Sequence, residues 1–226
     1  MVQDPHEFAI ALVQENHRWA QEGVAPTYSY ISAALSGPQL LYWVRSFMWR
    51  EYALGVHPPA KMITLLGNQH EDLKLLLSTQ MADEWHHAQV FSERAYALGG
   101  DGDLAHFEPS EADLEAYRAT MDFAHPEELA ASLNITGEVW LQTLYKYLAD
   151  PAAPRLEPET SELVRQQVLA EPRYDQGCIL DDGTALRLRD EVIPDEGRHI
   201  RIGRLVVEAL ATTQAAQDRV RAAVQP

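Results

Sequence analysis

Hydrophobic residues recur along most of the chain every three to four positions, which is the period of an amphipathic helix. Strand-like alternation is scarce, and good helix formers (Ala, Leu, Glu, Gln and Arg) fill the periodic stretches. The pattern predicts helices over residues 3–22, 38–66, 69–98, 126–148, 159–170 and 184–210, a short acidic helix within 103–123, and a tail helix. No shift in composition divides the chain. We therefore predict one all-α domain over residues 1–226.

Glycine and proline mark where these helices should end. The stretch EGVAPTYSY (22–30) predicts a turn after the first helix, and HPP at 57–59 predicts a kink or break, because proline removes a helical donor. Gly67 followed by Asn68 predicts a helix end. Three prolines in DPAAPRLEPE (150–159) predict a connection, and Pro194 predicts a jog in the last long helix.

Composition and charge exclude several classes of protein. Apolar residues make up 46% of the chain, enough for a sizeable core, and the net charge is −16. So acidic a chain is a poor candidate for binding nucleic acid or an anionic membrane. The N-terminal stretch predicts an amphipathic helix rather than a signal peptide, and no apolar run is long enough for a membrane span. Cys178 is the only cysteine, which excludes an intrachain disulfide and a thiolate metal site. We expect a cytoplasmic protein.

One motif, Asp-Glu-x-x-His, occurs twice: as DEWHH at 83–87 and as DEGRH at 195–199. Within each motif the glutamate and histidine are three residues apart, so they share one face of a helix. Both pairs fall within core stripes. The first lies among Leu76, Leu77, Gln80, Met81, Ala88 and Phe91, and the second among Leu188, Val192, Ile193, Ile200 and Val207. A buried glutamate needs a positive charge or a proton nearby, because burying an unpaired carboxylate costs several kcal/mol.

Two more glutamates lie in core stripes of other predicted helices. Glu51 lies among Val44, Phe47, Met48 and Leu54, and Glu138 among Ala131, Ile135, Leu141 and Tyr145. One glutamate from each of two helices plus Glu-x-x-His from each of two others is the ligand pattern of a carboxylate-bridged dimetal centre in a four-helix bundle. The predicted metal ligands are thus Glu51, Glu84, His87, Glu138, Glu196 and His199. Four carboxylates and two divalent cations would form a neutral cluster.

The position of the turns offers a test of this grouping. If Glu51 and Glu84 meet across an antiparallel hairpin, its turn should lie near residues 67 and 68, where the Gly-Asn stop signal occurs. Glu138 and Glu196 are farther apart in the sequence, and no comparable turn signal lies midway between them. Their connection must be long and irregular, as the proline-rich stretch indicates.

The aspartate that begins each motif also has a candidate role. Asp83 and Asp195 are each rotated by about 100° from the neighbouring glutamate, too far to replace it on the same axis. Each can instead accept the second imidazole N–H of the histidine on the opposite helix and so fix its tautomer. His86 lies on a different face from His87, and we assign it no metal.

Donors rich in oxygen with one imidazole per metal suit iron or manganese, although zinc would compete well for the same site. Six aromatic residues near these helices are candidates for lining a substrate pocket or carrying electrons, although aromatic residues in such seams are more often plain core: Trp43, Trp49, Tyr52, Trp85, Trp140 and Tyr145.

At these motifs the sequence resembles the ferritin-like di-iron carboxylate superfamily. The resemblance rests on Glu51 in WREYALG, on DEWHH, on Glu138 in ITGEVW and on DEGRH, and it spans about residues 38–210. It implies a ferritin-like four-helix bundle with additional helices. Ferritin fits less well, because its last core helix generally lacks the histidine. Bacterioferritin and rubrerythrin share both Glu-x-x-His motifs but have shorter, more regular bundles. The long segment between Glu138 and Glu196 is more similar to the oxygen-activating branch, which includes phenylacetic acid catabolic proteins and arylamine N-oxygenases.

The resemblance implies that the six ligands hold two iron ions, with a Mn/Fe pair as an alternative, and that one or two glutamates bridge them. Such a centre reacts with O₂ and oxidises a small organic substrate. No flavin or nicotinamide fingerprint is present, so the electrons would come from a partner such as a ferredoxin or a reductase. The resemblance is also compatible with a homodimer.

Two other functions remain open from the sequence. The first is iron handling of the ferritin or rubrerythrin kind, meaning iron oxidation, storage or peroxide removal. The second is a structural subunit of a multicomponent oxygenase, although such subunits commonly lose ligands and all six are present here.

Overall fold

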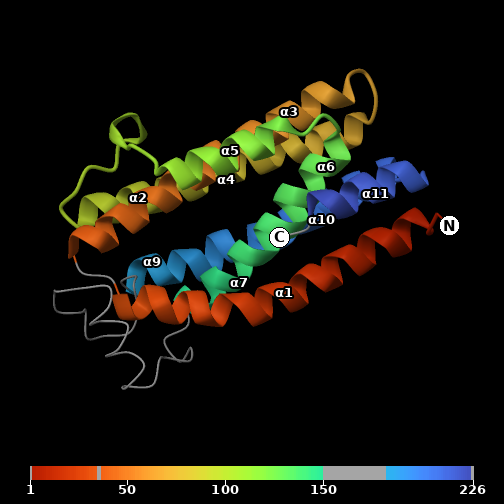
Figure 1. Cartoon of the computed structure of the whole chain (residues 1–226). Helices are drawn as coiled ribbons and strands as arrows, with labels where there is room; N and C mark the ends of the chain where they lie inside the picture. The colour runs from red at the N-terminus through yellow and green to blue at the C-terminus, as the bar shows by residue number, and fades with distance from the viewer. Residues whose placement is uncertain (1, 35–36, 150–181, 225–226) are drawn as a thin grey trace.

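The computed structural model describes residues 2–34, 37–149 and 182–224, and within these ranges every regular element is helical (Figure 1). This agrees with the predicted all-α class. The elements are α1 (Pro5–Ala34), α2 (Gly37–Ala53), α3 (His57–Leu66), α4 (Glu71–Ala97), η1 (Leu104–His106), α5 (Glu111–Asp122), α6 (Pro126–Ala130), η2 (Ala131–Gly137), α7 (Glu138–Ala149), α9 (Asp182–Arg187), η3 (Leu188–Val192), α10 (Ile193–Leu210) and α11 (Gln214–Ala223).

The helices form two groups that face each other (Figure 1). In the first group α2 and α3 pack along α4, and α5 lies over their outer side. In the second group α7 and α10 pack against each other and against α1. Direct contacts between α4 and α10 join the two groups. Four segments, α2, α4, η2–α7 and α10, therefore surround the interior between the groups.

The helix stops predicted at HPP and at Gly67 are confirmed. The break forecast at HPP follows α2, and α3 begins with its prolines at the first helical turn, where no donor is lost. The next stop is at Gly67, whose φ of 59° lies in the left-handed region that favours glycine. Together α2 and α3 run back along α4, as the hairpin test required.

The turn predicted at residues 22–30 is wrong, because α1 continues through Pro26 to Ala34. Tertiary packing explains the difference. Val24, inside the predicted turn, is fully buried in the core, and Gly23 lies against Trp140 of α7. A helix that continues past residue 22 buries this apolar surface, which outweighs the local preference for a turn.

Two of the predicted helices contain a π-helical segment. The helix predicted over 126–148 is made of α6, η2 and α7, and the one predicted from residue 184 is made of α9, η3 and α10. The jog expected at Pro194 is the π-helical η3, which ends just before that residue. Each π-helical segment ends shortly before a glutamate that the sequence predicts as a metal ligand, and such segments are frequent at functional sites.

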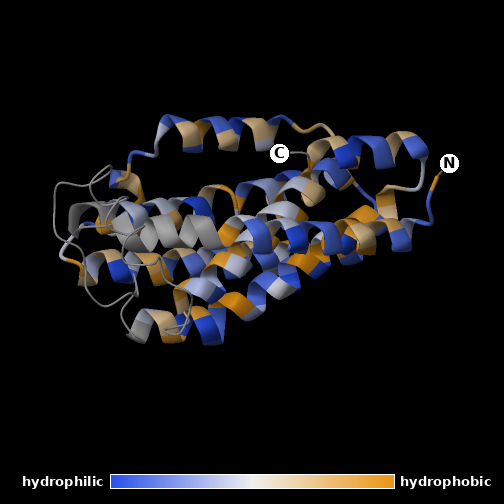
Figure 2. Cartoon of the chain, turned by 60° about the horizontal axis from the view of Figure 1, so that its bottom comes forward, coloured by the Kyte–Doolittle hydropathy of each residue, from blue (hydrophilic) through white to orange (hydrophobic). Residues whose placement is uncertain are grey.

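A buried polar layer divides the core into two hydrophobic clusters. Along α4, Leu73 and Leu77 belong to one cluster and Val90, Phe91 and Ala95 to the other. Buried polar residues lie between them on the same helix: Gln80, Glu84 and His87. The same order recurs along η2–α7 and α10, where Glu138 and Glu196 lie between the two clusters. Figure 2 shows hydrophobic and hydrophilic residues on different sides of the helices.

The helix predicted over 159–170, the turns near 172–183 and Cys178 lie wholly or largely outside the described residues. Among the helices that the structure describes, none combines the length and the apolar character needed to cross a membrane.

Gly203 provides a test of how closely α10 approaches η2. A Cβ at this position would be 2.3 Å from the Cβ of Asn134, so we expect Gly203→Ala to lower the free energy of unfolding by about 1–3 kcal/mol. Gly137→Ala is the matched control, because its Cβ would come no closer than 3.6 Å to another atom. Urea denaturation measures both changes. Equal stability of the two variants would contradict the close packing.

Candidate metal centre

All six predicted ligands lie in the buried polar layer. Glu51 comes from α2, Glu84 and His87 from α4, Glu138 from the start of α7, and Glu196 and His199 from α10. None is more than 2% exposed. The structure therefore brings together, away from solvent, six side chains that are spread over 149 positions of the sequence.

His87 directs its Nδ1 atom at three carboxylates. This nitrogen lies 3.4 Å from Glu84 Oε2, 3.5 Å from Glu196 Oε1 and 3.6 Å from Glu51 Oε2. These separations suit ion pairs, but within the described part of the chain neither His87 Nδ1 nor Glu196 Oε1 makes a hydrogen bond, although both atoms are buried. A bound cation would satisfy both of these atoms.

His199 repeats the arrangement on the other side of the cluster. Its Nδ1 lies 3.0 Å from Glu84 Oε1, 3.1 Å from Glu196 Oε2 and 3.8 Å from Glu138 Oε1. Glu84 and Glu196 thus each direct one oxygen at each imidazole. A carboxylate that faces two imidazoles with separate oxygens has the placement of a bridging ligand, whereas Glu51 and Glu138 each face one imidazole.

The donor atoms form two groups that can each hold a metal ion. The first consists of Glu84, Glu138, Glu196 and His199, and the second of Glu51, His87 and Glu196, with the atoms of each group within 4.8 Å of one another. Glu196 belongs to both groups, so two ions would share it. Carboxylate oxygens with one imidazole per ion are a donor set that iron, manganese and zinc accept.

The aspartates of the two motifs lie where the sequence predicted. His87 Nε2 is 3.4 Å from Asp195 Oδ2, and His199 Nε2 is 3.2 Å from Asp83 Oδ2. An N–H at Nε2 donates to the aspartate and leaves the Nδ1 lone pair for a metal. Arg198 joins the two aspartates, since its Nη2 lies 2.7 Å from Asp83 and 2.9 Å from Asp195.

Without a metal, the charges of the cluster are balanced by protons. Burial raises the pKa of Glu51 to about 8. Burial and the nearby charge of Glu196 raise the pKa of Glu138 well above its usual range. Burial also acts to raise the pKa of Glu84, but the two imidazoles outweigh it and hold that pKa well below its usual value. Burial would lower the pKa of His199, yet Glu84 and Asp83 raise it well above the ordinary value. Two cations can replace these protons.

A buried amide network that the sequence motifs did not reveal supports the cluster. Gln80 Nε2 donates to Glu138 Oε1 at 3.2 Å and approaches Glu84 Oε1 at 3.4 Å. Asn134 Nδ2 in turn donates to Gln80 Oε1 at 2.6 Å and to the His199 carbonyl at 3.2 Å. The available signal was a glutamine within the core stripe of the first motif, since a buried amide requires partners.

Of the aromatic candidates, Tyr145 reaches the cluster directly. Its hydroxyl group donates a hydrogen bond to Glu51 Oε1, and its ring packs against Phe47 and Phe91. Trp85 instead points outward and is 47% exposed. His86 also lies away from the cluster, with its Nε2 2.8 Å from Glu191.

Comparison of the chain with protein-family models, curated proteins and solved structures finds no match. The functional interpretation of the site therefore depends on its own residues and geometry.

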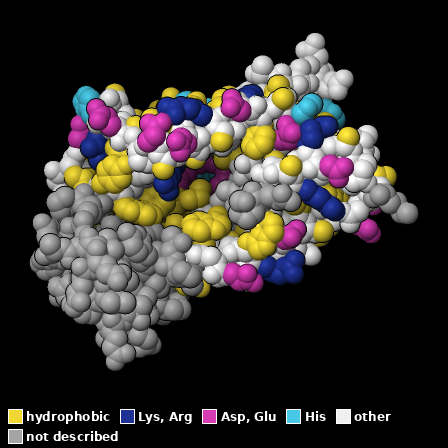
Figure 3. Space-filling view, viewed as in Figure 1, with side chains coloured by type: hydrophobic (Ala, Val, Ile, Leu, Met, Phe, Trp, Pro, Cys, Tyr) yellow, Lys and Arg dark blue, Asp and Glu magenta, His cyan; other side chains and the backbone are white. Residues whose placement is uncertain are grey.

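A cavity of about 300 Å³ leads to the cluster from one side. It is bounded by residues of α2, α4, α5, η2 and α7, and it reaches Glu51, Glu84 and Glu138. In Figure 3 the same face shows a hollow bordered largely by hydrophobic side chains, with acidic side chains in its depth. The buried donors can therefore be reached by a small molecule.

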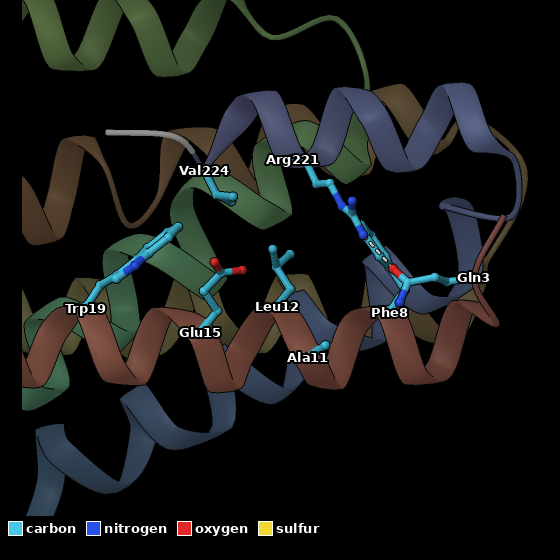
Figure 4. A pocket seen from close by; sticks show the side chains of 8 residues that line it. All are labelled: Gln3, Phe8, Ala11, Leu12, Glu15, Trp19, Arg221 and Val224. Atoms are coloured by element: carbon cyan, nitrogen blue, oxygen red, sulfur yellow. Dashed lines mark hydrogen bonds between the residues drawn. The ribbon is translucent and has the colours of Figure 1, made fainter. Parts of the chain in front are cut away.

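A second cavity, of about 430 Å³, lies between α1 and α11, away from the cluster (Figure 4). Its basic side chain, Arg221, is already engaged, because it lies 5.3 Å above the ring of Phe8 and donates to Gln3 Oε1 at 2.5 Å. Among the residues described around this cavity, Glu15 is the only acidic one and none is a histidine. We assign it no chemistry.

The aspartate contacts predict an effect on metal affinity. Asp195→Asn replaces the acceptor of His87 Nε2–H with an amide, which weakens control of the tautomer and the basicity of the imidazole. We expect the affinity for Co²⁺ to fall by about 10–100-fold in isothermal titration calorimetry. Asp190→Asn is the control, since this exposed aspartate pairs only with Arg189 among the contacts found in the described part of the chain. An unchanged Co²⁺ affinity in Asp195→Asn would remove the proposed role of the aspartate.

The charge balance predicts a contrast between two glutamates in protein stripped with a chelator. Glu84 lies within 3.4 Å of both imidazoles, so Glu84→Gln leaves buried positive charge unpaired and should destabilise the fold by about 3–5 kcal/mol. Glu138 keeps its proton, so Glu138→Gln should change stability by less than about 1 kcal/mol. Guanidinium chloride denaturation measures both values. A reversed order would refute this distribution of charge.

Proposed function

We propose that this chain is a carboxylate-bridged dimetal oxidoreductase, with two iron ions or a Mn/Fe pair, that uses O₂ to oxidise a small organic substrate. The observation that supports it most is the placement of Glu84 and Glu196, each of which directs one oxygen at each of two buried histidines. Two metal ions held side by side by shared carboxylates can accept and donate the electrons that O₂ reduction requires.

In this proposal the chain holds the metals, orients a substrate and excludes water. Glu51 and His87 would bind one ion, Glu138 and His199 the other, and Glu84 and Glu196 both. Asp83 and Asp195 keep the Nε2 protons of the histidines in place. The hydrophobic clusters on both sides of the polar layer keep bulk water from the ligands, which strengthens the electrostatic interactions inside.

The cavity favours oxidation of a substrate over iron storage. It opens on three of the four glutamates, and its walls are mostly apolar, as expected where an organic molecule rather than an aqueous ion is admitted. The electrons would come from a separate donor protein such as a ferredoxin or a reductase. Peroxide removal or iron oxidation by the same ligands is the alternative, and it needs no organic substrate.

Metal content provides the first test of the proposal. After anaerobic loading with Fe²⁺, we expect elemental analysis to find about two iron ions per chain. Glu84→Ala/His199→Ala should lose both, because it removes a shared carboxylate and an imidazole. Glu191→Ala/His86→Ala is the matched control, since it removes the same two kinds of group from a partly exposed pair beside the motifs. Wild-type protein that takes up no Fe²⁺ would refute the proposal. Two irons that react with peroxide but do not speed O₂ consumption when a chemical reductant is added would favour peroxide removal.

A further inference from the structure

We propose that the cavity beside the polar layer binds a small carboxylic acid with an apolar body, and that Arg50 recognises its carboxylate. The idea that this acid is the substrate rests on the proposed function. Its binding by Arg50 does not depend on that function, because Arg50 is not a proposed metal ligand.

The size and walls of the cavity limit the ligand. A volume of about 300 Å³ is at the lower end of the range of small-molecule sites, about 300–1,000 Å³. The larger apolar side chains of the wall are Leu54 just after α2, Leu133 in η2, and Trp140 and Leu141 in α7, and α5 adds Ala112 and Ala116. This volume suits a single ring or a short chain rather than a long acyl chain or a nucleotide conjugate. When such an apolar ring or chain binds, it buries the apolar wall of the cavity away from water, which favours binding.

Charge determines the polar group of the ligand. Of the described residues that line the cavity, Arg50 is the only basic one. Its Nε and Nη2 lie 2.8 and 2.7 Å from Asp113 Oδ1, while the other oxygen of Asp113 accepts from Ser110 Oγ at 2.7 Å. Within the described residues, Nη1 of Arg50 has no such partner. Asp113 therefore fixes the guanidinium and leaves a row of N–H donors, and a carboxylate is the group that best fits such a planar edge.

The glutamates of the cavity do not exclude an anionic ligand. Glu51, Glu84 and Glu138 lie 3.6, 3.0 and 3.8 Å from a buried imidazole nitrogen, and the two metal ions of the proposed centre would neutralise them further. Arg50 and Asp113 also cancel each other. A carboxylate that enters the cavity thus finds the other charges paired and can accept hydrogen bonds from the free N–H groups of Arg50. An ammonium group would instead face the positive charge of the same guanidinium.

The ligand is also placed with respect to the metals. Arg50 and Glu51 are consecutive residues of α2, so a carboxylate on Arg50 would be close to the cluster, and its body would extend along Leu133 and Trp140. Gly137 borders the same space, and a Cβ there would meet no other atom closer than 3.6 Å. A larger side chain at 137 should therefore fill the cavity without disturbing the backbone.

The test is calorimetric titration of benzoate into the full chain, both loaded with Zn²⁺, which is redox-inert, and stripped with a chelator. Benzamide and benzylamine, with the same ring, are titrated alongside. We expect benzoate to bind at least about 10-fold more tightly than either, because only it can make a charge-assisted pair. Arg50→Gln should remove this preference, and Arg50→Lys should restore only part of it. Gly137→Val should weaken the binding of all three compounds.

Arg118→Gln is the matched control, because Arg118 lies on α5 but pairs with Glu111 and does not line the cavity. It should leave benzoate binding unchanged. Benzoate binding that is no tighter than that of benzamide, or that survives Arg50→Gln in a variant with an unaltered melting temperature, would overturn the role of Arg50. Binding that is unaffected by Gly137→Val would overturn the location. The Zn²⁺ content of the same samples separates these results from failure of the dimetal centre itself.

Discussion

Four glutamates buried in one layer are the constraint on which the rest of this structure depends. A lone carboxylate cannot be moved from water into a protein core without a compensating charge or proton. Here four are placed within reach of two imidazoles, and the imidazoles are held from behind by Asp83 and Asp195. The imidazoles do not balance all four carboxylates, so the layer can hold cations, as a fully paired ion-pair network could not.

The hydrophobic clusters above and below the polar layer have a second effect besides stabilising the fold. They keep the buried glutamates and histidines in a medium of low polarity, where each charge interaction is stronger than in water. In these surroundings Gln80 donates a hydrogen bond to Glu138, and Asn134 donates one to Gln80, so the amide network orients the Glu138 carboxylate. The order apolar, polar, apolar recurs along α4, η2–α7 and α10 because each helix must cross both clusters and the layer between them.

Much of this arrangement could be predicted from the sequence, and the omissions have physical causes. A glutamate in a core stripe conflicts with the hydrophobic pattern, so Glu51, Glu84, Glu138 and Glu196 could be recognised one helix at a time. The stop signals at HPP and Gly67 act locally and are confirmed, whereas the turn predicted over 22–30 is wrong. The length of α1 depends on what Val24 packs against, which no local pattern contains. The π-helical segments were missed for a similar reason: one extra residue hardly alters the hydrophobic period, and the need for it arises from where the next side chain must point.

The π-helical segment η2 contributes Leu133 and Gly137 to the wall of the cavity and leads directly into Glu138. A segment of this kind can exchange one residue with the α-helix beside it, a slip that rotates the next helix by about 100°. The shape of the cavity and the orientation of the Glu138 carboxylate are therefore linked through η2. A molecule that displaces this wall would therefore also move the Glu138 carboxylate, and in the proposed dimetal centre a change of substrate would change the donor geometry around the metals.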